Sequence, residues 1–66
     1  MTITEILELK VGDRVEFAPD GEFHSAGTVE EVDGPARWIR WDDNGHKSVV
    51  VGHERSSLYK SIRREG

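Results

Sequence analysis

The sequence predicts an all-β fold, a small barrel of about five antiparallel strands, from three observations. Residues 37–51, RWIRWDDNGHKSVVV, place two segments rich in aromatic and β-branched residues on either side of Asn44-Gly45, a dipeptide typical of tight β-hairpins. Turns containing glycine or proline interrupt the rest of the chain at short intervals. The 66 residues suffice for one domain with a thin core, because a chain of this size buries only about 60% of its unfolded surface.

Five segments have the composition of strands. Alternation in the first places Val15 and Phe17 on one face. In the second, Val29 points inward while Val32 falls out of register, which predicts a bulge or a twist at the strand end. Residues 52–57 are polar and predict a turn, or one 3₁₀ turn, before the last strand. The predicted strands are residues 14–18, 27–32, 36–41, 47–51 and 58–62.

The two ends of the chain are less regular. Thr2 and Glu5 fit a capping box for a short helix, whereas the apolar alternation over residues 7–11 fits a strand. We expect a loosely helical or extended lead-in over residues 1–10. Residues 63–66 predict a frayed polar tail.

A two-residue loop at the Asn-Gly dipeptide determines which side chains of the hairpin face the core. It places Asp42 opposite Lys47, an opposite-charge pair that supports this register. We expect Trp41 in the core, with a partner for its indole N–H. One face then holds Ile39, Trp41, Ser48 and Val50, and the other holds Trp38, Arg40, Asp42, Lys47, Val49 and Val51.

The charge and cysteine content favour a cytoplasmic protein. The net charge of −4 argues against general nucleic-acid binding, which rewards clustered Lys and Arg. Residues 1–33 contain two bases and nine acids, and residues 34–66 seven bases and four acids, so we expect the two halves to form ion pairs across the barrel. The chain has no cysteine, and its first ten residues contain neither a basic leader nor a long apolar run. We therefore expect no membrane partner.

The sequence contains no pattern that indicates catalysis or a cofactor. The histidines His24, His46 and His53 fall in three predicted loops without the close spacing of metal ligands, so we expect no metal site. Asp42 and Asp43 are adjacent and would point to opposite faces of a strand, so they cannot share a proton. A nucleophile elbow and a phosphate-binding glycine loop are missing. We expect no catalytic residue, no cofactor and no enzyme.

Trp38 and Arg40 are the outward side chains best suited to binding, because Trp and Arg are enriched at interface hot spots. Trp38 has a second candidate role, in which it covers Val51 and the lead-in and supports the thin core. The first expectation is a module that binds another protein or associates with itself. Its candidate surface comprises Trp38, Arg40, Val49 and Val51, with Tyr59 or Phe23 nearby.

The alternative function is weak binding of nucleic acid by the basic residues of the C-terminal half, with aromatic residues interleaved. The net charge disfavours this function, and the same bases are able to pair with acids of the first half. The candidate residues are Arg37, Lys47, Lys60, Arg63 and Arg64.

Three motifs stand out: VGDRV at residues 11–15, GTVEEV at residues 27–32, and GP at residues 34–35 leading to IRWDDNGH at residues 39–46. Together they resemble a family of small actinobacterial proteins catalogued as a domain of unknown function, whose members look like SH3-like barrels. The resemblance covers roughly residues 9–52 and implies an SH3-like barrel more strongly than it implies any function. We expect a single domain of this kind over residues 1–66, with its core in residues 9–62.

The chain departs from this family at two places. The family has an aromatic and a small apolar residue where Arg37 and Trp38 stand, and a Pro-Gly pair where this chain has Gly52-His53. Both departures fall on the expected outer face and its connector, so a partner of the family need not be shared. A divergent stand-alone barrel also suits a bacteriophage-encoded protein.

Overall fold

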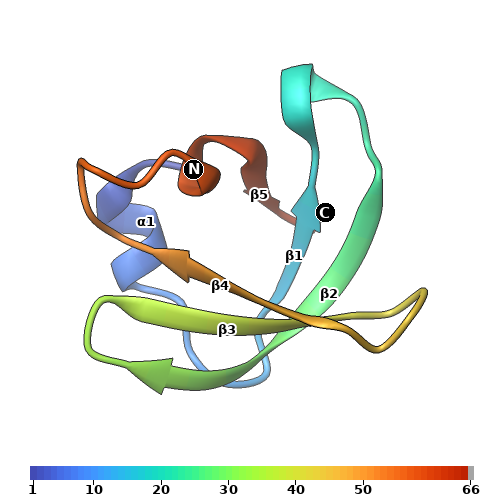
Figure 1. Ribbon diagram of the computed structural model, residues 1–66, viewed down its shortest axis with the longest axis horizontal. Coiled ribbons are helices and arrows are strands. Elements are labelled where there is room, and N and C mark those ends of the chain that lie inside the picture. The colour runs from blue at the N-terminus through green and yellow to red at the C-terminus, as the bar shows by residue number, and fades with distance from the viewer. Residues whose placement is uncertain (66) are drawn as a thin grey trace.

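Five antiparallel strands form one curled sheet with the order β4-β3-β2-β1-β5, which encloses about half of a barrel (Figure 1). The computed structural model describes residues 1–65. This architecture confirms the predicted small all-β barrel. The strands are β1 (Arg14–Phe17), β2 (Ser25–Asp33), β3 (Ala36–Trp41), β4 (Lys47–Val51) and β5 (Ile62–Arg64); the helices are α1 (Ile3–Leu7) and the 3₁₀ helices η1 (Pro19–Gly21) and η2 (Leu58–Ser61).

The long strand β2 gives the sheet its curl, because it pairs with β1 in its first half and with β3 along its length. A register shift between Val29 and Glu31 leaves Glu30 as the extra residue and confirms the predicted bulge. Gly27 lies where β2 crosses β3, and a Cβ there would stand 2.6 Å from the carbonyl oxygen of Arg40. Only glycine therefore allows this close approach.

The β3–β4 hairpin has a four-residue loop, residues 42–45, and not the expected two-residue loop. Trp41 pairs with His46 through a 2.9 Å hydrogen bond from its amide to the His46 carbonyl. Arg40 therefore lies opposite Lys47, and Asp42 does not. The Asp42 amide instead donates to the carbonyl of Ala26 on β2, at 2.9 Å, which holds Asp42 outside the β4 ladder. The register moves by two residues, so every side chain keeps its predicted face.

The C-terminal segment also differs from expectation. Residues 58–61, expected to begin the last strand, form η2, and β5 begins only at Ile62. The strand then continues through Arg63 and Arg64, which pair with Glu16 and Val15 of β1, so these two residues of the expected frayed tail are ordered in the sheet. Gly66 lies outside the described residues. The single 3₁₀ turn before the last strand is confirmed, although it comes later than residues 52–57.

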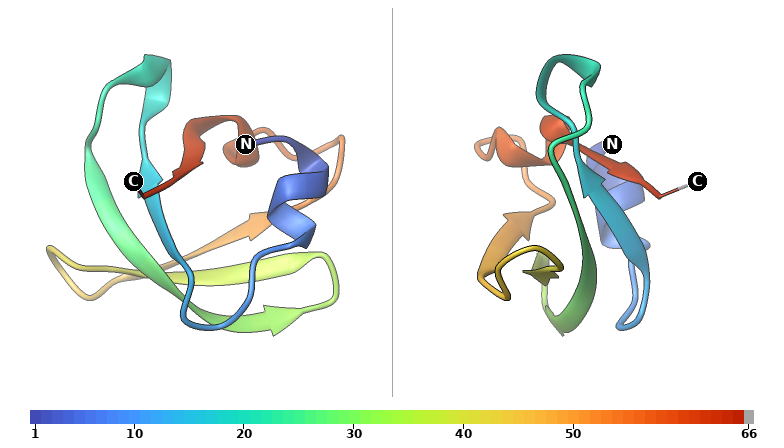
Figure 2. Two further views of the ribbon diagram at one scale, coloured as in Figure 1. Left: turned by 180° about the vertical axis from the view of Figure 1, so that it is seen from behind. Right: turned by 90° about the vertical axis from the view of Figure 1, so that its right-hand side faces the viewer.

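Helix α1 resolves the ambiguity of the first ten residues in favour of a helix. The Thr2 hydroxyl accepts from the Glu5 amide at 3.2 Å, and the Glu5 carboxylate accepts from the Thr2 amide at 2.8 Å, which confirms the capping box. Figure 2 shows α1 and η2 side by side at one end of the curled sheet, and the Met1 nitrogen donates to the Tyr59 carbonyl at 3.1 Å. No helix of residues 1–65 is long and apolar enough to cross a membrane.

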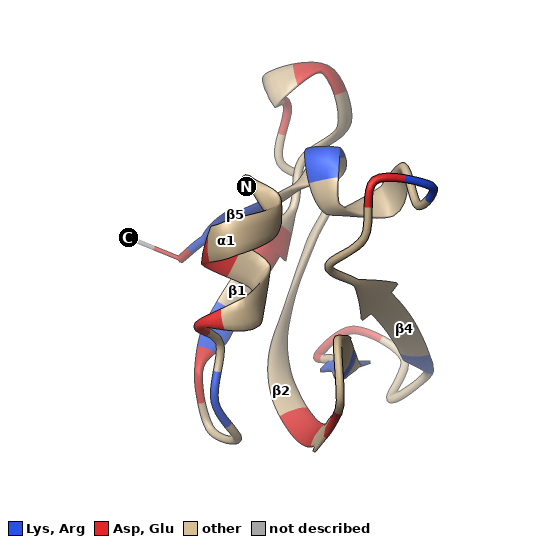
Figure 3. Ribbon diagram, turned by 90° about the vertical axis from the view of Figure 1, so that its left-hand side faces the viewer, with Lys and Arg blue, Asp and Glu red and all other residues tan. Residues whose placement is uncertain are grey.

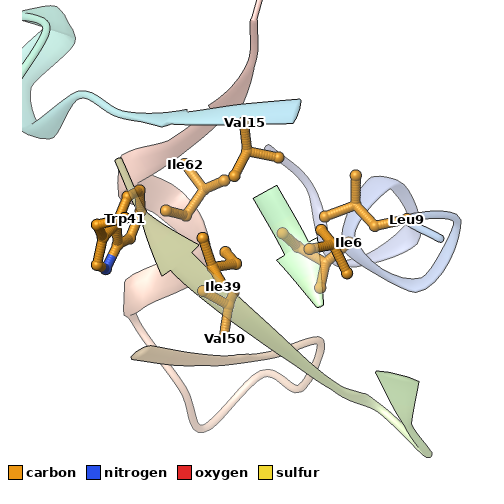
Figure 4. Packing of buried hydrophobic residues seen from close by; sticks show 8 residues of the cluster. Ile6, Leu9, Val15, Ile39, Trp41, Val50 and Ile62 are labelled. Atoms are coloured by element: carbon orange, nitrogen blue, oxygen red, sulfur yellow. The ribbon is translucent and has the colours of Figure 1, made fainter. Parts of the chain in front are cut away.

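The hydrophobic core fills the concave side of the sheet and extends to α1 (Figure 4). Trp41 is 9% exposed, and its indole N–H donates to the Ser48 hydroxyl at 2.9 Å, which confirms both the expected burial and the need for a partner. The buried cluster comprises Ile6, Leu9, Val15, Val29, Ile39, Trp41, Val50 and Ile62.

Among residues 1–65, Arg37 is the one charged residue buried with this core, at 5% exposure. Its guanidinium donates to the carbonyl oxygens of Leu7 (2.7 Å), the last residue of α1, and of Leu9 (2.9 Å) in the segment that connects α1 to β1. It also donates to the carbonyls of Gly34 (2.6 Å) and Ala36 (3.2 Å) at the β2–β3 turn. The Arg37 side chain therefore links the α1–β1 connector to the β2–β3 hairpin. The expectation that Arg37 lies on the surface with the other bases is wrong.

Replacing Arg37 with methionine should lower the free energy of unfolding by about 2–4 kcal/mol, because buried carbonyls lose their donors. Arg37→Lys keeps the charge but loses the planar fork, so it should also destabilise. Urea denaturation followed by circular dichroism measures both effects. Arg55→Met removes an exposed arginine and should change stability by no more than about 0.5 kcal/mol. Equal stabilities of the Arg37 and Arg55 variants would contradict the structural role of Arg37.

Candidate functional site

The convex side of β2, β3 and β4 carries three rows of directly opposed residues, which we call the Trp38 face. Arg37, Ile39 and Trp41 of β3 are buried, so the alternating residues of that strand point away from the core. This agrees with the outward position expected for Trp38 and Arg40. The rows are Glu31, Trp38 and Val49; Asp33, Ala36 and Val51; and Thr28, Arg40 and Lys47.

The apolar side chains of the Trp38 face remain partly open to solvent. Val49 is 37% exposed and lies directly opposite the half-buried Trp38. Val51 is half-buried in the neighbouring row. None of these three belongs to the core cluster or to the partly buried side chains packed against it. They form an apolar strip on the outside of the sheet, separate from the core.

An ion-pair network borders this strip. Glu30, the extra residue of the bulge, accepts from the Arg40 Nε at 2.6 Å and lies 3.2 Å from the Lys47 ammonium. The hydrogen bond from Arg40 lowers the pKa of Glu30 below its ordinary value, so this carboxylate remains ionised at neutral pH. The bulge thus places one acid where it holds two bases of adjacent strands.

The structure does not bring the two expected neighbours to the Trp38 face. Tyr59 lies on η2 and packs half-buried against the core cluster. Phe23 is 56% exposed but lies between η1 and β2, outside the three rows. Trp38, Arg40, Val49 and Val51 remain together as expected.

The basic residues proposed for nucleic-acid binding do not form one surface. Arg37 is buried, and Lys47 lies on β4 whereas Arg63 and Arg64 lie on β5, at the opposite end of the sheet order. Three of these bases pair with acids of the first half: Lys47 with Glu30 at 3.2 Å, Arg63 with Glu16 at 2.7 Å, and Arg64 with Asp13 at 3.7 Å. Lys60 stands 6.0 Å from the centre of the Tyr59 ring.

Two of the remaining polar candidates, Asp42 and His53, have structural partners. Asp42 forms a bidentate pair with Arg14, with contacts of 2.9 and 2.5 Å, which lowers the pKa of its carboxyl group. The Nδ1 atom of His53 accepts from the Arg55 amide at 3.1 Å. Within residues 1–65, no group of three or more His, Cys, Asp and Glu side chains is placed to hold a metal ion.

A shallow groove of ≈ 590 Å³ opens between the α1–β1 connector and the end of β2, and the sequence alone did not indicate it. Leu7, Val11 and Val32 line it and are 45%, 64% and 41% exposed. Val11 and Val32 lie in segments that were expected to be strands or turns. Their apolar character was therefore the only feature of the sequence that could have indicated the groove. The charged lining consists of Glu8, Lys10 and the carbonyl-bonded Arg37.

Comparison of the chain with family models, with curated proteins and with solved structures finds no match. The functional argument therefore depends on the geometry of the chain itself.

The two tryptophans should differ in their access to solvent, because Trp38 lies on the convex face and Trp41 in the core. We expect acrylamide to quench the Trp41→Phe variant, which retains Trp38, at least about twofold more strongly than the Trp38→Phe variant. Stern–Volmer plots of the folded variants measure this ratio. Equal quenching would show that Trp38 is covered and would remove it from the candidate surface.

The Arg14–Asp42 pair should make stability depend on pH. Because its folded-state pKa lies below the ordinary value of 3.8, Asp42 contributes stability that is fully present above that value and lost as the pH falls through the folded pKa. Asp42→Asn should therefore reduce stability at neutral pH and flatten the decline of stability below about pH 4. Urea denaturation at each pH measures the slope. Asp43→Asn, which alters the adjacent exposed acid, should leave the slope unchanged.

Proposed function

We propose that this chain is a non-enzymatic binding module that contacts another protein through the Trp38 face. The observation that supports this proposal is the pairing of Trp38 with the exposed Val49 on the convex side of the sheet, apart from the core. A tryptophan supplies a large apolar area at low entropic cost, which is why it is enriched at hot spots.

The size of the molecule favours a flat contact over a deep peptide groove. An interface of ordinary size buries about 800 Å² of each partner. This is about a fifth of the 4173 Å² surface of the chain, and so covers most of one side of the barrel. Trp38 would lie near the centre of such a contact, with Val51 beside it and the Arg40 network at its rim. A centre of apolar side chains with a polar rim is the usual anatomy of protein interfaces.

The pairing of bases with acids makes nucleic acid the poorer candidate ligand. Phosphate contacts need Lys and Arg side chains that are free to exchange their counterions. Lys47, Arg63 and Arg64 already have carboxylate partners. Membership of the actinobacterial SH3-like family, a phage or actinobacterial source and a cytoplasmic location remain proposals that rest on the sequence.

Affinity capture tests the proposed function. The immobilised chain should retain one or more proteins from an extract of its source cells, and retention should fall at least about tenfold with Trp38→Ala. Val49→Ser, a milder change at an exposed site, should also weaken retention. Quantitative mass spectrometry measures the retained proteins, and thermal melting confirms that each variant is folded.

Phe23→Ala provides the matched control, because it truncates an exposed aromatic side chain outside the Trp38 face. This variant should retain the same proteins as the unmodified chain. Equal retention by the Trp38 and Phe23 variants would contradict the proposed surface. If nuclease treatment removed the retained material, and if retention fell steeply as salt was raised, the result would instead favour nucleic acid as the ligand.

A further inference from the structure

We propose that the partner presents basic side chains, Lys or Arg, to the Trp38 face, where they lie between Trp38 and the acids of β2. This inference rests on the proposed function and specifies the partner's chemistry. The inference is based on the acidic side chains of this face that have no basic partner among residues 1–65.

Glu31 and Asp33 lie on the Trp38 face together with its apolar side chains. Glu31 is directly opposite Trp38, and Asp33 is directly opposite Ala36, in the row that ends at Val51. Both acids are exposed. Figure 3 shows acidic residues in red at the lower end of β2. Opposed residues of adjacent strands stand close enough for one long partner side chain to contact both.

The ion pairs of the chain leave these two acids uncompensated. The bases of the face, Arg40 and Lys47, both pair with Glu30. Neither Glu31 nor Asp33 has a Lys, Arg or His within ion-pair distance among residues 1–65. The Arg40 edge of the face thus carries two bases against one carboxylate, whereas the apolar strip is flanked by the free carboxylates of Glu31 and Asp33.

This division selects a cationic partner over an acidic one. A Lys or Arg side chain laid across the strip can rest its aliphatic stem on Val49 and hold its charge near Glu31. The ring of Trp38 attracts a cation placed over its face. Phosphates and acidic peptides would meet the free carboxylates of Glu31 and Asp33 and be repelled. Apolar contact and charge thus favour the same ligand.

Selection from a random 12-residue peptide library displayed on phage tests the inference. We expect the peptides that bind the chain, and that lose binding with Trp38→Ala, to be enriched in Lys and Arg. For the selected peptides, Glu31→Gln with Asp33→Asn should weaken the affinity by about threefold to tenfold, as the loss of two exposed charge pairs would. Fluorescence anisotropy measures the affinities, and they should fall as salt is raised.

Glu22→Gln with Glu54→Gln is the matched control, since it also removes two exposed acids but outside the three rows. It should leave the affinities within about twofold. Peptides that require Trp38 but are not enriched in bases, or that bind the Glu31 and Asp33 variant equally well, would overturn the inference and leave the proposed function standing. A selection that yields no Trp38-dependent peptide would overturn the inference, whereas the affinity capture described above decides the proposed function separately.

Discussion

The burial of Arg37 is the constraint on which the proposed binding surface depends. A guanidinium with 5% exposure must have partners for its donors, and it finds them in backbone carbonyls of two segments, at Leu9 and at Gly34. These bonds hold the α1–β1 connector across the open end of the half-barrel. They also determine which residues of β3 face the core: because Arg37 points inward, Trp38 must point outward. The surface that we propose for binding is therefore a consequence of a buried cation one residue away.

Local composition predicted the central hairpin well and its turn poorly. The bounds of β3 and β4 agree with the β-branched and aromatic runs, because no competing structure suits such residues. The register was wrong by two residues, since the Asp42 amide donates to the Ala26 carbonyl, a partner sixteen residues away along the chain. A register shift of two residues leaves each side chain on the same face of the sheet. The faces were therefore predictable, although the opposed residue pairs were not.

Long-range partners explain the residues that the sequence could not place. Arg37 occupies an inward position in the alternation with Ile39 and Trp41, so its burial was visible in the pattern. Two of the carbonyls that accept from its guanidinium, those of Leu9 and Leu7, are however 28 and 30 residues away along the chain. Tyr59 was misplaced for a different reason. Leu58–Ser61 alternates as a strand does, yet it forms a 3₁₀ helix whose apolar side chains turn toward the core. Short segments of this kind satisfy either period.

The charge asymmetry of the sequence takes a definite form in three dimensions. Of the seven bases of the second half, four pair with acids of the first half: Arg40 and Lys47 with Glu30, Arg63 with Glu16, and Arg64 with Asp13. Because these pairs use only three acids, other acids of the first half have no basic partner among residues 1–65. Glu31 and Asp33 are two of these, and strand pairing places Glu31 opposite Trp38 and Asp33 opposite Ala36. These uncompensated acids beside a partly exposed tryptophan are the observation that supports the proposed basic partner.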